Sequence, residues 1–436
     1  MVCETIDFRE ITLEEVTDQK IAYSFAGGPF GSDLKASDYS DEGIRIIQLQ
    51  NIKDGYFDNE YKIYTTKEKA DQLIKCNIFP GDIIIAKMAD PLARACIVPE
   101  HEDRYVMASD GIRLVVDENQ FNKYYVLYYI NSPVFRNQAI ENGTGTTRLR
   151  IGLNNLRQLK VLVPSLDEQN KIAEILITVD NAISKTEAII EQTEKVKKGL
   201  MQQLLSKGIG HTKLKNTEIG EIPEEWEIIA LNRIIIALEA GVSVNSENRL
   251  KQQYEKGILK TSAVTNRIFN PLEHKAILPN EIERAEISPQ KNCIIISRMN
   301  TPALVGASSY VDRDYDDLFL PDRLWQATID EQIANSLWLS YILTWSSMRA
   351  RIRDIATGTS GSMKNISKKA FLDLHIAFPK IEEQKRIANI LSSIDEKIIK
   401  ENQTLVQLKN IKKGLMQVLL TGKIRVEVDD QEVVTT

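Results

Sequence analysis

The sequence predicts an α+β protein with a pseudo-twofold internal repeat: two α+β domains separated by two long antiparallel helices. The prediction rests on three observations. A nearly identical phrase occurs twice, at Lys197–Ile209 and at Lys412–Ile424. Each copy closes a long amphipathic stretch, and each stretch follows a region of short β-rich runs and turns. A chain of 436 residues is also too long for one ordinary hydrophobic core.

The repeated phrase belongs to a longer internal match. When the sequence is slid along itself, about nineteen of the forty-two positions from Pro164 to Leu205 are identical to those that start at Pro379. The identical positions include Glu168-Gln169 with Glu383-Gln384, Asp180 with Asp395, and Lys197–Gln202 with Lys412–Gln417. Upstream we align Gly143 with Gly358, Ile151 with Ile366 and Leu159 with Leu374. We also expect DIIIAKM (82–88) and CIIISRM (293–299) to form equivalent buried strands.

Each repeated segment is expected to form one helix of about forty residues, about 60 Å long. A proline ends the strand before each helix, and acidic residues follow where they favour the positive end of the helix dipole. Apolar residues at heptad spacing would let the two helices pack on each other like a coiled coil. The residues assigned to this seam are Ile172, Ile175, Val179, Ile189, Val196, Leu200, Ile387, Ile390, Ile394, Leu408, Ile411, Leu415 and Val418. The seam is interrupted at Thr186, Thr193, Lys397 and Glu401.

These patterns divide the chain into six parts. We predict a first domain at 1–163, a central helix at 164–206, a polar linker at 207–220, a second domain at 221–378, a distal helix at 379–422 and a tail at 423–436. Within the domains, strands are expected at 43–52 and 110–117. The spacing of apolar residues is helical over 122–139, and 333–352 is its counterpart in the second half.

Motifs and composition favour a binding protein over an enzyme that acts alone. The sequence has no phosphate-binding loop, no dinucleotide-binding loop, and no histidine or cysteine pair at metal-ligand spacing. The four scattered cysteines suit a reducing compartment, so we expect a cytoplasmic location. The net charge of −6 counts mildly against a protein that binds nucleic acid without partners.

Basic residues nevertheless surround two loops rich in glycine, threonine and serine, at equivalent places in the repeat. Backbone amides beside arginines suit phosphate contact, and arginine forks also read guanine edges. A solvated loop would contain the same residues, but their recurrence in one register favours DNA contact. The candidate DNA-binding residues are Gly31, Ser32, Lys35, Gln48, Gln50, Asn51, Lys87, Arg94, Gly143, Thr144, Gly145, Thr146, Thr147, Arg148, Arg150, Arg298, Asn300, Arg323, Gly358, Thr359, Ser360, Gly361, Ser362 and Lys364.

The chain resembles specificity subunits of type I restriction–modification systems over nearly its whole length. The resemblance rests on GPFGSDLKASDY, GIRIIQLQNIKDG and GDIIIAKMADP, on the paired PSLDEQNKIAEIL and PKIEEQKRIANIL, on the KKGLMQ endings and on IGEIPEEWE. It implies two target recognition domains that read a split double-stranded DNA sequence, and helices that dock two methyltransferase subunits. It also implies a chain with no catalytic residue, metal or cofactor of its own. S-adenosylmethionine, ATP and magnesium would be bound by the methyltransferase subunits and by motor-nuclease subunits.

The two halves are not fully alike, and other functions stay open. IGEIPEEWE opens the second domain, whereas the first domain begins with FREITLEEV and lacks the tryptophan. The GPFGS loop has only EAGVSVNS (239–246) as a candidate copy, so the two domains are expected to read different sequences. A coiled-coil scaffold that binds only proteins is the main competing hypothesis. A methyltransferase within this chain is a weaker one, because no cofactor loop is found.

Overall fold

A computed structural model describes residues 8–427, apart from 89, 146–147, 266–267 and 359–361. The chain folds as two compact units. Unit 1 comprises the chain up to Glu187 together with the chain from Gln403, and unit 2 comprises Ala188–Asn402. Each unit therefore contains one α+β domain and one stretch of each long helix.

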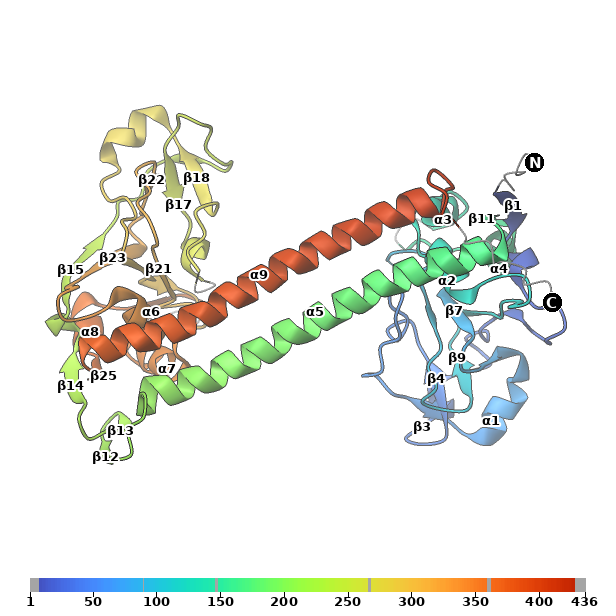
Figure 1. Cartoon of the computed structure of the whole chain (residues 1–436), viewed down its shortest axis with the longest axis horizontal. Coiled ribbons are helices and arrows are strands. Elements are labelled where there is room, and N and C mark those ends of the chain that lie inside the picture. The colour runs from blue at the N-terminus through green and yellow to red at the C-terminus, as the bar shows by residue number, and fades with distance from the viewer. Residues whose placement is uncertain (1–7, 89, 146–147, 266–267, 359–361, 428–436) are drawn as a thin grey trace, which may run out of the picture. The chain divides into compact units, whose positions relative to one another are not determined.

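The two predicted long helices are present and antiparallel. Helix α5 (Leu166–Lys207) has 42 residues and α9 (Ile381–Leu419) has 39, close to the predicted ranges (Figure 1). In unit 1, Asp180 pairs with Lys412 and Glu187 with Lys409, and in unit 2 Lys197 pairs with Asp395. The residue numbers fall along α9 as they rise along α5, which is the pattern of an antiparallel pair.

Unit 1 contains a four-stranded sheet of order β2-β10-β7-β8, a five-stranded sheet of order β3-β5-β4-β9-β6, and the pair β1-β11. Its largest hydrophobic core joins the four-stranded sheet to α2, to the start of α5 and to the end of α9. The elements are β1 (Arg9–Thr12), β2 (Phe25–Gly27), β3 (Tyr39–Ser40), β4 (Ile44–Ile47), β5 (Tyr64–Thr65), α1 (Lys67–Gln72), β6 (Asn77–Ile78), β7 (Ile83–Ala86), β8 (Ala95–Ile97), β9 (Tyr105–Met107), β10 (Gly111–Leu114), α2 (Lys123–Ile130), α3 (Pro133–Glu141), α4 (Leu153–Gln158) and β11 (Lys160–Val163).

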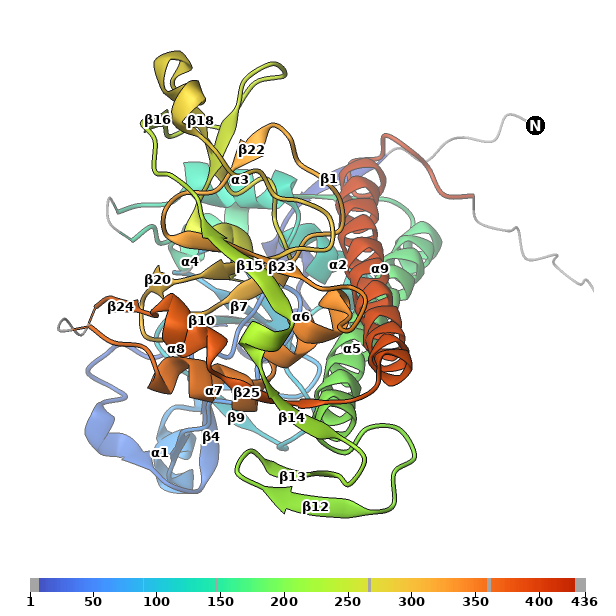
Figure 2. The same ribbon diagram turned by 90° about the vertical axis from the view of Figure 1, so that its left-hand side faces the viewer.

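Unit 2 contains sheets of order β15-β23-β19-β21 and β16-β18-β17-β22, and the pairs β12-β13, β14-β25 and β20-β24 (Figure 2). The range predicted as a polar linker includes β12 and the start of β13. The elements are β12 (Leu214–Thr217), β13 (Gly220–Pro223), β14 (Glu227–Ala230), β15 (Ile235–Ala240), β16 (Ser246–Glu247), β17 (Gly257–Leu259), β18 (His274–Ile277), β19 (Ile294–Ser297), β20 (Met299–Asn300), β21 (Ser308–Tyr310), β22 (Leu318–Phe319), β23 (Leu324–Ile329), α6 (Ser336–Thr344), α7 (Ser346–Asp354), β24 (Lys364–Asn365), α8 (Lys368–Leu372) and β25 (His375–Phe378).

The two units share one topology, as the internal repeat predicts. β7 and β19 hold the same place in equivalent antiparallel sheets, and the pair β1-β11 corresponds to β14-β25. β4 pairs with β9 in parallel, and so does β17 with β22. The runs in β7 (IIIA) and β19 (IIIS) are buried throughout, which suits the interior of a sheet covered on both faces.

The helical region at 122–139 forms two short helices, α2 and α3. The side chain of Asn122 caps α2 and that of Ser132 caps α3, where Pro133 takes a first-turn position that needs no N–H donor. The counterpart region forms α6 and α7, and Asn335 caps α6 in the same way.

The predicted seam is only partly confirmed. Ile189, Val196, Ile390 and Ile411 are 37–51% exposed, so their placement in a helix–helix seam was wrong. Two other residues assigned to the seam, Ile172 and Ile387, are buried against the domain cores. The buried helix residues in those cores are Ile172, Ala173, Leu176, Met416 and Leu419 in unit 1, and Met201, Leu204, Leu205, Ile387, Ala388 and Leu391 in unit 2.

Candidate nucleic-acid interface

In unit 1, Lys87 directly follows β7 and is held by two backbone hydrogen bonds. Its N–H donates to the carbonyl of Asp110 at 2.9 Å, and its carbonyl accepts from the N–H of Ile151 at 2.9 Å. Thr144 and Arg150 exchange backbone hydrogen bonds of 2.8 and 2.9 Å and close the predicted glycine–threonine loop as a hairpin. The sheet edge and the hairpin therefore form one surface.

The charge of this surface is partly compensated. Arg150 Nη2 lies 2.9 Å from Asp110 Oδ1, while Arg148 is exposed. Burial lowers the pKa of Lys87, and Arg150 acts in the same direction, whereas Asp110 raises it. Asp110 thus partly offsets the effect of burial on the pKa of the half-buried Lys87.

The Gly27–Lys35 loop starts at the same edge of the sheet. The N–H of Gly28 donates to the carbonyl of Gly111 at 2.8 Å. A Cβ at Gly28 would lie 1.9 Å from the carbonyl oxygen of Ala108, so only glycine fits this approach. The predicted residues Gly31, Ser32 and Lys35 are exposed on this loop.

The same arrangement recurs in unit 2 with different side chains. The N–H of Arg298 donates to the carbonyl of Arg323 at 3.0 Å, and its carbonyl accepts from Ile366 N at 2.9 Å. Arg298 therefore takes the place of Lys87, and the predicted equivalence of Ile151 with Ile366 is confirmed. Arg323 takes the place of Asp110, which replaces an acidic residue with an exposed basic one.

The stretch EAGVSVNS corresponds to the start of the GPFGS loop. The N–H of Gly241 donates to the carbonyl of Leu324, the residue equivalent to Gly111. A Cβ at Gly241 would lie 1.8 Å from the carbonyl oxygen of Leu320. Gly28 and Gly241 are therefore equivalent, and neither position has room for a side chain.

One pair in the sequence alignment was wrong. Thr144 bridges to Arg150 and Thr357 bridges to Asn365, so the residue equivalent to Gly358 is Gly145 and not Gly143. Both Gly145 (φ 107°) and Gly358 (φ 155°) have positive φ. The second hairpin is longer, which shifts the alignment. The alignment of Leu159 with Leu374 is confirmed, because their carbonyls accept from Leu13 and Leu231 in the two units.

Three of the candidate side chains point into the fold. Asn51 is fully buried, and its amide donates to the carbonyls of Asp58 and Tyr61. Arg94 donates to the carbonyls of Asp90 and Leu49. These hydrogen bonds link the loop after β7 to the turn that contains Gln48 and Gln50. Asn300 is 9% exposed and donates to Ser297 Oγ.

The other candidates lie at or near the two hairpins and the turn after β4. Gln48 is half-buried, its side chain donates to Tyr39 Oη at 3.5 Å, and Gln50 is exposed. Lys364 donates to the carbonyl of Gly358 at 3.1 Å, and Ser362 is exposed. Thr146, Thr147, Thr359, Ser360 and Gly361 lie outside the described residues.

Each domain is joined to the long helices by the same three side chains. In unit 1, Tyr128 Oη donates to Asp180 Oδ2 at 2.7 Å, and Lys412 Nζ lies 2.6 Å from Asp180 Oδ1. The lysine also lies over the tyrosine ring, 5.4 Å from its centroid. Burial raises the pKa of Tyr128, as does Asp180, so the hydroxyl keeps its proton and remains a donor. We call this Tyr–Asp–Lys group the clamp of unit 1.

Unit 2 has an equivalent clamp. Tyr341 Oη donates to Asp395 Oδ2 at 2.7 Å, Lys197 pairs with the same carboxylate, and its Nζ lies 5.7 Å from the centroid of the Tyr341 ring. In both units the aspartate comes from the helix that follows the domain and the lysine from the other helix. This geometry explains why the repeat keeps Asp180 with Asp395 and Lys197 with Lys412.

The repeated Glu-Gln pair holds the start of each helix. Gln169 donates to the carbonyl of Pro164 at 3.0 Å and accepts from Asn122 N at 3.0 Å. The equivalent Gln384 donates to the carbonyl of Pro379 at 2.8 Å and accepts from Asn335 N at 2.8 Å. Each glutamine therefore links its helix to the cap of α2 or α6.

The glutamates hold the segment that leaves the opposite helix. Glu168 accepts from Arg425 and from Val426 N, whereas Glu383 accepts from Ile209 N at 2.9 Å and contacts His211 Nε2 at 3.0 Å. Sequence reasoning identified the repeat but not these partners, because the partners themselves are not repeated.

The missing tryptophan of the first half is replaced in space by Phe8. Trp226 Nε1 donates to Glu383 at 3.0 Å, and its ring would meet a Cβ built on Gly208. In unit 1, the ring of Phe8 would meet a Cβ built on Gly422 in the same way. Both glycines come directly after a long helix, and both have positive φ.

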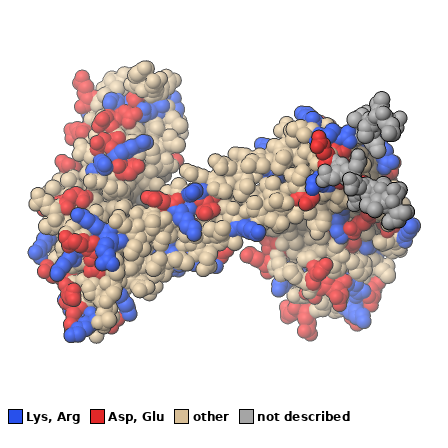
Figure 3. Space-filling view, viewed as in Figure 1, with Lys and Arg blue, Asp and Glu red and all other residues tan. Residues whose placement is uncertain are grey.

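Further features of the described residues concern metal-ligand clusters, membrane-spanning helices and surface charge. The described part of the chain contains no group of three or more His, Cys, Asp or Glu residues placed to hold a metal ion. Among the described helices, none is long and apolar enough to cross a membrane. On the face of unit 2 in Figure 3, lysine and arginine are interspersed with aspartate and glutamate.

Comparison with known proteins finds one family. The model of the type I restriction modification DNA specificity domain matches residues 34–195 and 223–410. The putative type I restriction enzyme MjaX specificity subunit of Methanocaldococcus jannaschii is 28% identical over 406 residues, which cover 88% of each chain. The EcoKI specificity subunit of Escherichia coli is 21% identical over 399 residues, covering 88% of this chain and 83% of that one. The crystal structure of the type I S subunit from M. genitalium superposes with a TM-score of 0.58 at 14% identity, covering 96% of this chain and 98% of that chain.

Proposed function

The chain belongs to the family of type I restriction–modification DNA specificity subunits, and on this premise we propose that each unit reads one half of a split DNA sequence. It is a non-catalytic subunit, since the homologues are specificity subunits and catalysis resides in their partners. The proposal assigns the two half-sites to the surfaces around Lys87 and Arg298.

One observation carries this proposal most directly. In both units a basic residue, Lys87 or Arg298, follows the same central strand, and its carbonyl accepts a hydrogen bond from the chain just after the hairpin. Beside it, Gly28 or Gly241 allows a second loop to approach closely. The backbone of this surface is shared, whereas its side chains differ at Asp110 and Arg323. A shared backbone suits contact with a regular phosphate chain, and different side chains suit different base sequences.

The candidates on these two surfaces have the chemistry that DNA recognition requires. Arg323 offers an exposed planar fork to guanine or phosphate, and Lys87 offers a point charge. The half-buried Arg298 also has a fork, although its Nε donates to the carbonyl of Asp322 at 2.6 Å. The glycine-rich hairpins offer backbone N–H groups. Asn51, Arg94 and Asn300 are better explained as residues that shape these loops from inside.

We further propose that the long helices dock two methyltransferase subunits. Ile189 and Val196 on α5, and Ile399, Val406 and Ile411 on α9, are 41–60% exposed. Exposed apolar residues on regular helices are typical of surfaces that a partner covers. S-adenosylmethionine would then be bound by the methyltransferase subunits, and ATP and magnesium by motor-nuclease subunits, in a cytoplasmic complex.

Salt dependence and sequence preference of the assembled complex test the DNA proposal. Phosphate contacts release counterions, so the affinity for a cognate duplex should fall by orders of magnitude between about 50 and 200 mM salt. Arg298→Ala should cost about 1–3 kcal/mol of discrimination at one half-site and leave the other half-site unchanged. Binding that ignores both salt and sequence would instead support a scaffold that binds only proteins.

A further inference from the structure

The unchanged block Lys197–Gln202 and Lys412–Gln417 contains residues whose place in the fold is clear. Lys197 and Lys412 belong to the clamps. Met201 and Met416 are 5% and 9% exposed and lie in the two main cores. The contacts within each unit account for these four residues.

Leu200 and Leu415 are partly buried against the same cores, whereas the three other identical positions face outward. Lys198, Gly199 and Gln202 are exposed on α5, as are Lys413, Gly414 and Gln417 on α9. None of the four lysine and glutamine side chains has a hydrogen bond or ion pair to another described residue. The fold therefore does not account for their identity in the two copies.

The fold also does not explain why both copies have a glycine in this block. Glycine weakens a helix interior relative to alanine. A Cβ built on Gly199 or on Gly414 would meet no atom within 4 Å, and neither has positive φ. Neither the backbone nor the packing requires glycine, so the open space beside each one is available to something outside the chain.

A groove lies beside the block in each unit. The groove of unit 2 has a volume of about 440 Å³ and runs between α5, α9 and the junction of α6 with α7. The groove of unit 1 has a volume of about 310 Å³ and runs between α9 and the junction of α2 with α3. Equivalent residues line both grooves: Lys197 with Lys412, Lys198 with Lys413, and Met201 with Met416.

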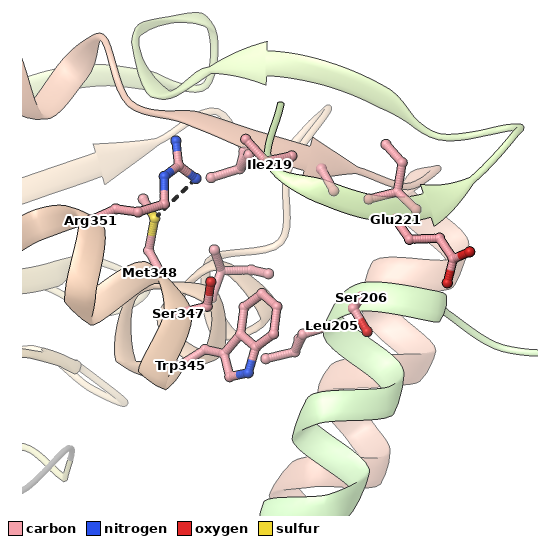
Figure 4. Close-up of a pocket in the computed structure, with 12 residues that line it drawn as sticks. Leu205, Ser206, Ile219, Glu221, Trp345, Ser347, Met348 and Arg351 are labelled. Carbon is pink, nitrogen blue, oxygen red and sulfur yellow. Dashed lines mark hydrogen bonds between the residues drawn. The ribbon is translucent and has the colours of Figure 1, made fainter. Parts of the chain in front are cut away.

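The shared lining defines the chemistry of an occupant. Met201 or Met416 provides an adaptable apolar contact in each groove. Lys198 or Lys413 provides a positive charge in the lining of the same groove. Trp345 adds an aromatic wall in unit 2 and also lines a separate small apolar cavity of about 40 Å³ (Figure 4). An apolar segment that carries a carboxylate complements both grooves.

We propose that each groove receives one methyltransferase subunit through such a segment, whose backbone passes close to Gly199 or Gly414 and whose carboxylate pairs with Lys198 or Lys413. This inference rests on the proposed docking function and specifies where and how the partner binds. Because the two sites are equivalent, the two subunits would bind in equivalent ways.

Substitution of the glycines separates partner binding from folding. In G199Q and G414Q the new side chain fills open space on a helix, so the melting temperature should stay unchanged or rise. Native mass spectrometry of the complex co-expressed with its methyltransferase subunit should show two partner subunits on the wild type, one on either variant and none on the double variant. G199A should have a smaller effect, and S184Q, an exposed position on α5 outside the block, should retain both subunits.

Charge reversal provides an independent measurement. K198E with K413E should weaken binding of the methyltransferase subunit by about tenfold and should make the remaining binding less sensitive to salt. Two subunits retained on the glycine double variant would overturn the inference and leave helix docking elsewhere intact. A wild-type chain that binds no methyltransferase subunit would overturn the proposed docking function itself.

Discussion

Unit 1 and unit 2 hold their domains to the long helices with the same atoms but differ where their central strands end. The Tyr128–Asp180 and Tyr341–Asp395 hydrogen bonds are both 2.7 Å, and each carboxylate also pairs with a lysine of the other helix. At the strand ends, in contrast, Asp110 of unit 1 corresponds to Arg323 of unit 2. The residues that hold each domain to the helices are therefore shared, whereas the proposed DNA-reading surfaces have diverged.

The largest expected effect comes from the glycine at the edge of each sheet. Gly28→Val and Gly241→Val each force a Cβ to within 2 Å of a backbone carbonyl, so each should destabilise its own unit by roughly 3 kcal/mol or more. All four tryptophans, at 226, 325, 338 and 345, lie in unit 2. Urea unfolding followed by tryptophan fluorescence should thus detect the change at 241, and circular dichroism should detect both.

Gly31→Val is the matched control, because a Cβ at that exposed position meets nothing within 4 Å. If Gly28→Val and Gly241→Val differed greatly in their effects, the two loops would not be structurally equivalent.

A smaller and equal effect is expected from the clamps. Tyr128→Phe and Tyr341→Phe each remove one hydrogen bond to a carboxylate that keeps its lysine, so each should cost about 1 kcal/mol of unfolding free energy. Tyr124→Phe, at a 40% exposed ring, should cost much less. The losses are measured by urea unfolding. Unequal losses for the two clamp tyrosines would show that the two clamps are not equivalent.

The smallest expected effect is a difference in pH dependence between the two proposed DNA-reading surfaces. Burial lowers the pKa of Lys87, so its ammonium loses the proton at a lower pH than a free lysine does. The equivalent position in unit 2 is occupied by Arg298, and a guanidinium group does not deprotonate in proteins. Between pH 8 and pH 10, binding should therefore weaken several-fold at the half-site read by unit 1 and stay constant at the other half-site. Titrations with duplexes that carry one cognate half-site measure this difference, and Lys87→Arg should remove it.

The sequence predicted the repeat, the long helices and the shared strands because identical residues and apolar periodicity directly encode local structure. It identified Lys197 and Asp395 as repeated but did not pair them, because the contact joins residues far apart in sequence through a tyrosine in the divergent region. The heptads were assigned to a helix–helix seam because periodicity shows that a stripe is apolar without showing what covers it. For the same reason, the sequence could not show that Asn51 and Arg94 point inward.

Exchange of one recognition domain tests the central claim most directly. Residues 8–163 would be replaced by the first domain of another specificity subunit, with the clamp residues Tyr128, Asp180 and Lys412 preserved. Sequencing of methylated sites in a host that expresses the chimaera should show one half-site changed and the other half-site as in the wild type. If both half-sites changed, or if neither did, the two units would not read DNA independently.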